Sequence, residues 1–153
     1  MASNGKKIVE ARAVVKHYGG FEAVRGIDFH IESGECFGLL GPNGAGKTTT
    51  VRMLCCVLPL TSGSISVFGL DAGRNPREIK ARLGVCPQEN NLDPDFGVRQ
   101  NLIVFSRYFD IPKALASMRA DEVIKRFRLE DKAGVCVEDL SGGLKRRLMV
   151  ARC

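Results

Sequence analysis

The stretch Gly41-Pro42-Asn43-Gly44-Ala45-Gly46-Lys47-Thr48-Thr49 has the spacing G-x-x-x-x-G-K-[ST], which predicts a phosphate-binding loop. Glycine adopts backbone conformations that other residues avoid, so successive N–H groups of the loop can point toward a single anion. Lys47 supplies a flexible positive charge for the phosphates, and Thr48 supplies a hydroxyl for Mg²⁺. The residues assigned to this nucleotide site are Gly41, Asn43, Gly44, Ala45, Gly46, Lys47, Thr48 and Thr49.

The sequence on both sides of the loop has the context that this motif requires. Cys36 to Leu40 form a continuous apolar run, which is typical of a strand covered on both faces. Residues 48–58 have a helical pattern, and the positive end of that helix dipole would lie at the bound phosphates. A glycine-rich turn that happens to precede a helix is the alternative, and this context disfavours it. We therefore expect a strand, loop and helix that together bind ATP.

Length and composition are those of one ordinary globular domain, with 153 residues and a net charge of +6. Residues 1–7 lack the apolar core of a signal peptide, and no segment approaches the roughly 20 apolar residues of a membrane span, so we expect a cytoplasmic protein. The basic residues are spread along the chain, which does not favour a nucleic-acid partner. The six cysteines form no C-x-x-C pair, which indicates reduced thiols rather than a metal site.

Hydrophobic periodicity divides the chain into a β-rich part and a helical part. Residues 8–18 and 23–31 alternate as a hairpin around Gly19-Gly20, and residues 64–68 alternate as a further strand. From Val98 onward the spacing becomes helical. The expected later elements are a short helix ending at residue 83, a short strand at 84–86, and helices over 98–109, 118–127 and 142–152. The predicted fold is therefore α/β, with a β section and loop core in residues 1–97 and a helical subdomain in residues 98–153.

The stretch Leu140-Ser141-Gly142-Gly143-Leu144-Lys145-Arg146-Arg147-Leu148 closely resembles the signature sequence of ATP-binding-cassette proteins. Ser141 can cap the helix that begins at the paired glycines, which leaves free N–H groups at a positive helix end for another phosphate. An ordinary helix cap is the alternative for this triplet taken alone. The resemblance covers essentially the whole chain, and it implies an ATP site formed by the loop of one subunit and Ser141, Gly142 and Gly143 of another.

The resemblance implies roles for two further residues. Gln88, in Cys86-Pro87-Gln88, looks like the catalytic-site glutamine that reaches the metal and the attacking water. Tyr18 looks like the aromatic residue that stacks on adenine. The alternatives are a plain loop amide for Gln88 and a half-buried strand aromatic for Tyr18. Thr48 and Gln88 are therefore the expected Mg²⁺ ligands.

The amino-acid sequence of several stretches is similar to that of the ATPases of drug-resistance and nodulation-factor exporters. These stretches are Ser33 to Leu40, Asn90 to Asp93 and Phe105 to Phe109. Leu144 departs from the pattern, because that position usually holds Gln or, in this subgroup, Met. Leucine is an apolar substitute of similar volume, so we expect little effect.

A larger departure from the family is that the sequence ends at Cys153, before the apolar strand that would end in Asp-Glu and before the switch histidine. The resemblance assigns the general base to that region, so we expect these residues to bind nucleotide without turning it over. In the family that strand lies beside residues 36–40. We therefore expect an incomplete core with an open apolar sheet edge, and aggregation of the isolated chain.

The function implied by the resemblance is that of the ATP-binding subunit of a transporter, and the subgroup implies a transporter of the exporter type. It would pair head to tail with a second ATP-binding subunit and act on a transmembrane permease at the inner face of the membrane. Two alternatives remain open at this point. One is a soluble cassette ATPase that acts on ribosomes or nucleic acid, and the other is a non-catalytic nucleotide-binding fragment.

Overall fold

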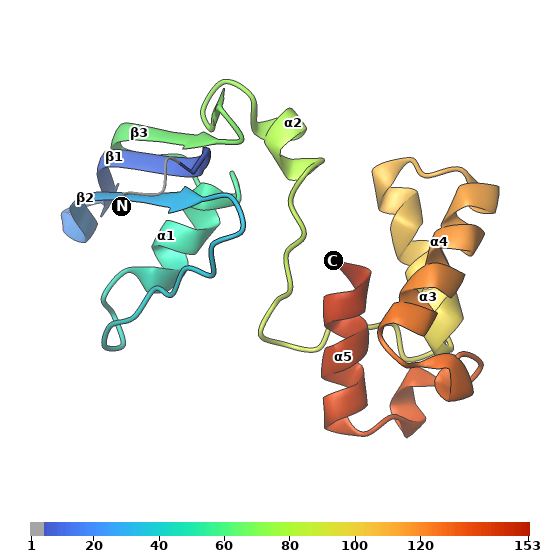
Figure 1. Ribbon diagram of the computed structural model, residues 1–153. Coiled ribbons are helices and arrows are strands. Elements are labelled where there is room, and N and C mark those ends of the chain that lie inside the picture. Colours follow the sequence, from blue (N-terminus) through green and yellow to red (C-terminus); the bar gives the residue numbers. More distant parts are fainter. Residues whose placement is uncertain (1–4) are drawn as a thin grey trace. The chain divides into compact units, whose positions relative to one another are not determined.

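The computed structural model describes residues 5–153. Their contacts divide them into a first unit that ends at Leu83 and a second unit that begins at Gly84 (Figure 1). Each unit has a hydrophobic core drawn from its own residues. The loop of Gly41–Thr49 belongs to the first unit, and the Ser141-Gly142-Gly143 triplet belongs to the second.

The described part of the first unit is built on a four-stranded sheet with the spatial order β2-β1-β3-β4. β1 (Lys7–Tyr18) and β2 (Phe21–Glu32) form the predicted antiparallel hairpin around Gly19-Gly20. β3 (Ser62–Val67) confirms the strand predicted from its alternating pattern, and it pairs antiparallel with β1. The short β4 (Leu70–Asp71) pairs with β3.

Helix α1 (Lys47–Leu54) lies against one face of this sheet and contacts β2 and β3 (Figure 1). It ends before the predicted Leu58, because Cys56 adopts a left-handed backbone with φ of 55° that a continuing helix excludes. α2 (Pro76–Lys80) begins at a proline, which suits a first turn because its missing N–H would have no helical partner there. The buried core of this unit is Ala11, Val14, Val24, Met53, Ile65, Val67 and Ile79.

The prediction of a strand at Cys36–Leu40 is wrong for this structure. Residues 35–42 form neither helix nor strand, and Leu40 is 93% exposed. The short strand predicted at 84–86 is also absent. A strand needs a neighbour for its backbone N–H and C=O groups, and no described strand pairs with either segment. Phe37 instead stacks on Phe29 of β2, with ring centroids 5.3 Å apart.

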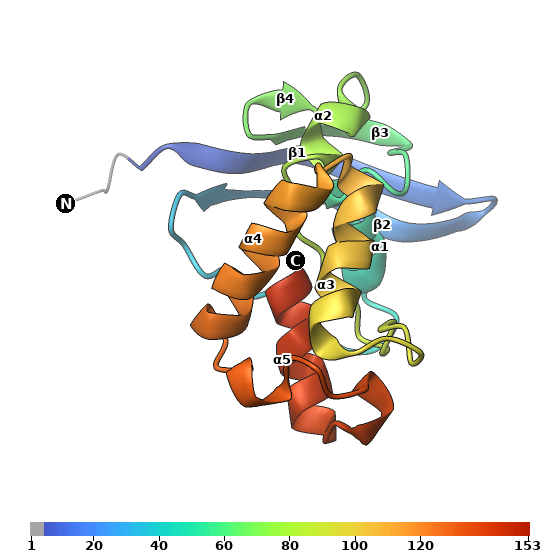
Figure 2. The ribbon, with the colours of Figure 1, turned by 90° about the vertical axis from the view of Figure 1, so that its right-hand side faces the viewer.

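The second unit confirms the three predicted helices. α3 (Val98–Ser106) continues as the 3₁₀ turn η1 (Arg107–Phe109), α4 (Lys113–Arg126) follows Pro112, and α5 (Gly142–Arg152) follows Ser141. The 3₁₀ turns η2 (Glu130–Lys132) and η3 (Val137–Asp139) connect α4 to α5. α3 contacts both α4 and α5, and Figure 2 shows the three helices beside one another.

The apolar spacing of α4 predicts that Met118, Val123, Ile124 and Phe127 face the core, and the prediction is wrong only at Met118, because Val123 and Phe127 pack against the core. Ala116, Ala120 and Ile124 are buried, whereas Met118 is 54% exposed. The small alanines share a face at helical spacing, which allows α4 to approach α3 closely. The buried core of the second unit is Leu92, Val98, Leu102, Ile103, Ala120, Ile124, Leu129, Val137, Leu140, Leu148 and Met149.

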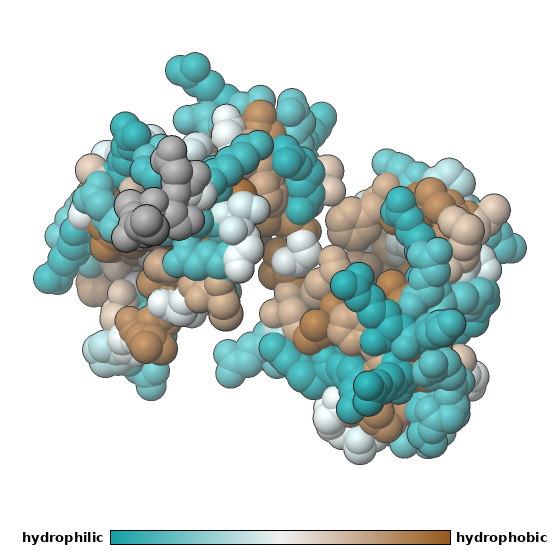
Figure 3. Space-filling model, viewed as in Figure 1, coloured by the Kyte–Doolittle hydropathy of each residue, from teal (hydrophilic) through white to brown (hydrophobic). Residues whose placement is uncertain are grey.

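Hydrophobic side chains also reach the surface of both units (Figure 3). In the first unit, Val57 is 66% exposed and Phe21 is 61% exposed, in addition to Leu40. In the second unit, Tyr108 is 80% exposed. Among residues 5–153, no helix combines the length and the apolar character that a bilayer crossing requires.

Candidate functional site

The loop before α1 is curled, as its glycine pattern predicts. Asn43 and Gly44 form a turn, and the Ala45 N–H donates to the Pro42 carbonyl oxygen at 3.3 Å. Gly44 and Gly46 have φ angles of 83° and 81°, which L side chains rarely adopt. These two positions therefore require glycine for the loop to turn back toward the helix.

The Lys47 side chain folds back over this loop. Its Nζ donates to the carbonyl oxygens of Gly41 and Pro42, both at 2.7 Å. The ammonium group therefore lies at the loop rather than in open solvent. Because carbonyl and phosphate oxygens both accept hydrogen bonds, the same ammonium position suits a phosphate.

The first turn of α1 is open to an anion. It contains no acidic side chain, so the positive end of the helix dipole is not neutralised locally. Thr48, the expected magnesium ligand, is exposed, and Thr49 is half-buried. Thr50 is buried and bonds the Gly46 carbonyl oxygen through both its N–H at 2.8 Å and its hydroxyl at 3.0 Å, which holds the start of the helix in place.

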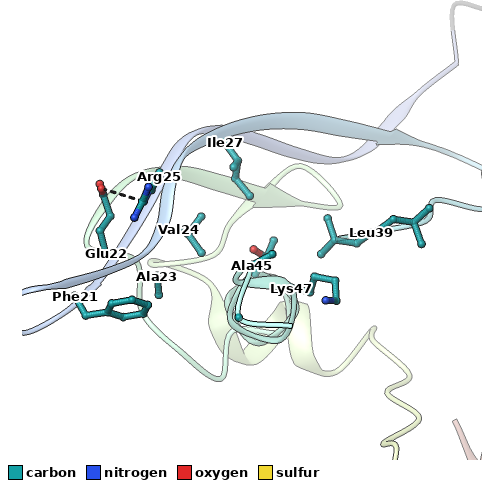
Figure 4. A pocket seen from close by; sticks show the side chains of 12 residues that line it. Phe21, Glu22, Ala23, Val24, Arg25, Ile27, Leu39, Ala45 and Lys47 are labelled. Atoms are coloured by element: carbon teal, nitrogen blue, oxygen red, sulfur yellow. Dashed lines mark ion pairs between the residues drawn. The ribbon is translucent and has the colours of Figure 1, made fainter. Parts of the chain in front are cut away.

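A pocket of about 500 Å³ lies beside the loop, under strand β2 (Figure 4). In Figure 4 the labelled residues of β2 pass over the turn that carries Ala45 and Lys47. The pocket is mostly apolar, and Lys47 gives it a positive charge. Its lining residues are Phe21, Glu22, Ala23, Val24, Arg25, Ile27, Leu39, Leu40, Gly44, Ala45, Lys47 and Thr50.

Tyr18, the expected adenine partner, lies at the end of the hairpin and is 47% exposed. The Lys16 Nζ is 5.3 Å from the centre of its ring. Tyr18 is not among the residues that line the pocket, but Phe21, which pairs with it across the hairpin, does line it. Sequence reasoning missed Phe21. The signal that points to it is an aromatic residue placed directly after the Gly19-Gly20 turn.

Ser141 caps α5 as predicted. Its Oγ accepts a hydrogen bond from the Leu144 N–H at 3.4 Å, and the first turn of α5 contains no acidic side chain. Gly142 and Gly143 are exposed, and a Cβ on either would meet nothing within 4 Å. The N-terminus of α5 is therefore accessible. Leu144 packs against the core of the second unit, which agrees with its apolar character.

Gln88 is exposed in a bend of the second unit, within a segment that has neither helix nor strand from residue 84 to residue 93. The structure thus brings the residues of Gly41–Thr49 together in the first unit. Gln88 and the Ser141-Gly142-Gly143 triplet belong to the second unit.

The cysteines and acidic residues provide no metal site within residues 5–153, because no three His, Cys, Asp or Glu side chains gather there. All six cysteines are free thiols. Burial raises the pKa of Cys55 and of Cys56, which disfavours their reactive thiolate forms.

The sequence profile of a family described as ABC transporter matches residues 24–153. Nod factor export ATP-binding protein I of Paraburkholderia xenovorans (strain LB400) is 50% identical over 144 residues, which are 94% of this chain and 47% of that protein. The protein of the same name in Cupriavidus pinatubonensis (strain JMP 134 / LMG 1197) is 46% identical over 145 residues, which are 95% of this chain and 45% of that protein. This chain therefore spans about half the length of the curated relatives it matches.

Two solved structures share the fold and confirm the predicted α/β class. One is described as the ATP binding subunit of an ABC transporter. It has a TM-score of 0.79 and 22% identity, with 95% of this chain and 61% of that chain covered. The other is cbiO1 from Clostridium perfringens, described as part of the ABC transporter complex cbiONQ. It has a TM-score of 0.86 and 25% identity, with 96% of this chain and 61% of that chain covered.

Proposed function

Because this chain belongs to the ABC transporter family, we propose that it is the ATP-binding part of an exporter and that residues 41–49 hold the phosphates of Mg-ATP. The observation that carries the proposal is the position of the Lys47 ammonium, bonded to the carbonyl oxygens of Gly41 and Pro42. Phosphate oxygens would replace these carbonyls as acceptors, and the charge-assisted bonds would become stronger. The left-handed glycines and the helix N-terminus support the same anion.

Mg²⁺ fits the oxygen donors that this chain offers. Magnesium prefers hard oxygen ligands and keeps several waters, so one hydroxyl from Thr48, the side-chain oxygen of Gln88 and the phosphates suffice without an all-protein cage. When bound, the ion would offset negative charge on the β- and γ-phosphates. Thr48 is exposed at the first turn of α1, which supports its role as a ligand.

The nucleoside end of ATP would lie toward the β1–β2 hairpin. Tyr18 and Phe21 face each other in register at the tip of this hairpin, and both are exposed. An aromatic face there would stack on adenine, and the apolar lining of the pocket would cover the ribose side. Phe21 supports this assignment more directly than Tyr18, because it lines the pocket that Lys47 also lines.

The exposed N-terminus of α5 supports a second copy of this chain as a partner. Ser141, Gly142 and Gly143 of a second copy would contact the ATP held by Lys47 of the first, so that ATP joins the two copies. The relatives named for Nod factor export and the cbiONQ complex support a membrane permease as the further partner. The chain would then lie at the cytoplasmic face of the membrane through that permease.

Replacement of Lys47 by alanine tests the nucleotide site. We expect the affinity of Lys47→Ala for Mg-ATP to fall at least about tenfold, because hydrogen bonds to a charged group contribute roughly 1.5–3 kcal/mol each. The chain has no tryptophan, so the fluorescent reporter is placed on the nucleotide, as in trinitrophenyl-ATP displaced by ATP.

The matched control is Lys80→Ala, which removes an exposed lysine from α2 of the same unit. This variant has the same net charge as Lys47→Ala. The control is expected to bind as the unaltered chain does. Equal affinity in Lys47→Ala and Lys80→Ala, with circular dichroism unchanged in both, would overturn the proposed site.

A further inference from the structure

The segment that carries Gln88 is bonded to helix α5 on both sides of the glutamine. Before it, the Arg146 Nη1 donates to the Pro87 carbonyl oxygen at 2.5 Å. After it, the Arg152 Nη1 donates to the Asn91 carbonyl oxygen at 3.1 Å, and its Nη2 donates to the Asn91 Oδ1. All three bonds join residues of the second unit that lie far apart in sequence.

Arg152 is itself held in place by α3. Its guanidinium carbon lies 4.1 Å from the centre of the Phe105 ring, a distance at which a cation is attracted to the aromatic face. Burial lowers the pKa of Arg152, although an arginine remains charged at any physiological pH. The side chain that holds Asn91 is therefore partly desolvated and restrained, which strengthens its hydrogen bonds.

The far end of the same segment is anchored by Asn101 of α3, which is only 3% exposed. Its Oδ1 accepts from the Asp93 N–H at 2.9 Å, and its Nδ2 donates to the carbonyl oxygens of Asp93 at 3.0 Å and Phe96 at 3.1 Å. Residues 93–97 are thus fixed independently of α5. Between Pro87 and Asn91, the two arginines supply the hydrogen bonds that join the segment to α5.

The two points of attachment are close together both on the helix and on the segment. Arg146 and Arg152 are about 9 Å apart along the axis of α5, since each helical residue rises about 1.5 Å. Pro87 and Asn91 are at most about 14 Å apart in an extended chain. Gln88 therefore lies on a short stretch of chain between the two points of attachment.

We propose that Arg146 and Arg152 are positioning residues that fasten the Gln88 segment to α5, the helix that begins at the Ser141-Gly142-Gly143 triplet. The inference rests on the proposed function, in which Gln88 and the triplet both serve ATP. It gives the two arginines a role that neither the loop motif nor the signature assigns.

Alkylation of Cys86 provides the test, because Cys86 directly precedes Pro87 and packs half-buried against the core of the second unit. The rate is measured for each cysteine by mass spectrometry on the full 153-residue chain without nucleotide. We expect Arg152→Ala, and the double variant with Arg146→Ala, to accelerate Cys86 alkylation about tenfold, since lost bonds to a charged group open the segment. Cys56 of the first unit is the internal reference and should not change.

Arg147→Ala is the matched control, because Arg147 is an exposed arginine of the same helix that makes no hydrogen bond or ion pair within residues 5–153. Arg152→Lys should slow Cys86 alkylation relative to Arg152→Ala, but not to the rate of the unaltered chain. Lysine lacks the two guanidinium nitrogens that bond the carbonyl oxygen and the Oδ1 of Asn91. That graded rescue distinguishes a positioning role from general destabilisation.

An unchanged Cys86 rate in the double variant, with circular dichroism intact, would overturn the proposal. If the double variant does not fold, Asn91→Ala carries the test, because it removes the side-chain acceptor and leaves both arginines in place. The measurement needs no nucleotide, so Lys47→Ala should alkylate at the normal rate. The nucleotide-binding measurement therefore tests the proposed ATP site, and the alkylation measurement tests this inference separately.

Discussion

Gly46 occupies a position where both space and backbone conformation exclude a side chain. A Cβ there would overlap the Ala23 carbonyl oxygen of β2 and lie 3.1 Å from the Val24 side chain. Its φ of 81° adds conformational strain for any other residue. The close approach of the loop to β2, which shapes the pocket, depends on this residue.

Gly46→Ala is expected to lower the free energy of unfolding by about 3 kcal/mol, as the sum of overpacking and left-handed strain. Gly44→Ala is the matched control, because Gly44 has φ of 83° but a Cβ there meets nothing within 4 Å. Strain alone should cost it about 1 kcal/mol. Urea unfolding followed by circular dichroism measures both, and equal losses would show that the contact with Ala23 is unimportant.

At the scale of elements, a bidentate ion pair between Arg99 and Asp121 joins α3 to α4. The Arg99 Nε donates to the Asp121 Oδ1 at 2.6 Å, and the Arg99 Nη2 donates to the Asp121 Oδ2 at 2.9 Å and to the Ser117 hydroxyl at 2.6 Å. The hydrogen bonds from Arg99 lower the pKa of Asp121 below its usual value. The charged carboxylate is therefore favoured in the folded state.

This pair predicts a pH dependence of a definite sign. Because the pKa of Asp121 is lower in the folded state than in the unfolded state, its contribution is present above the ordinary aspartate pKa of about 3.9 and is lost as pH falls through the lowered value. The urea midpoint of Asp121→Asn should therefore lie below that of the unaltered chain at neutral pH, and the difference should shrink in acid.

Glu122→Gln is the control for this prediction. It removes one negative charge from the adjacent exposed position of α4, where Glu122 makes no ion pair within the described residues. Its midpoint should follow that of the unaltered chain at every pH. A difference for Asp121→Asn that stays constant down to the lowest pH would contradict a role for the carboxylate charge.

At the scale of the whole molecule, exposed apolar side chains favour self-association. Among residues 5–153, Leu40 is the most exposed large hydrophobic residue, at 93%, and Phe37, three residues earlier, is 39% exposed. Exposed apolar side chains promote association of copies in water when they come together in a patch. The net charge of +6 opposes that association only in part.

Leu40→Lys is expected to reduce self-association of the chain, measured as the weight-average mass by sedimentation at several concentrations. Ser33→Lys is the control, because it adds the same charge at an exposed turn position without removing an apolar side chain. If charge alone matters, both variants will dissociate equally, and the role assigned to Leu40 will be wrong.

Sequence reasoning found the parts of the candidate site that depend on local chemistry. The curled loop requires glycine at positions 44 and 46, and the cap at Ser141 requires a side-chain oxygen before a helix. These signals lie within a few consecutive residues, so they can be recognised in the sequence alone. The same holds for the helices at 98–106 and 142–152, whose spacing is periodic.

The sequence misled where the outcome depends on distant partners. The apolar run at 36–40 has the composition of a buried strand, but strand formation requires a neighbour, and none of the described strands supplies one. Phe21 and the two arginines of α5 were overlooked for a similar reason. Phe21 enters the pocket because the hairpin folds over the loop, and Arg152 reaches Asn91 from a position 61 residues away.

The sequence by itself determined the curled glycine loop before α1, the helix cap at Ser141 and the family, because each rests on residue types at short fixed spacings. Only the tertiary structure decided that Lys47 folds onto the loop carbonyls, that Gly46 packs against Ala23, and that α5 holds the Gln88 segment. Those contacts join residues brought together by folding, and no local pattern encodes which distant carbonyl a lysine or an arginine will reach.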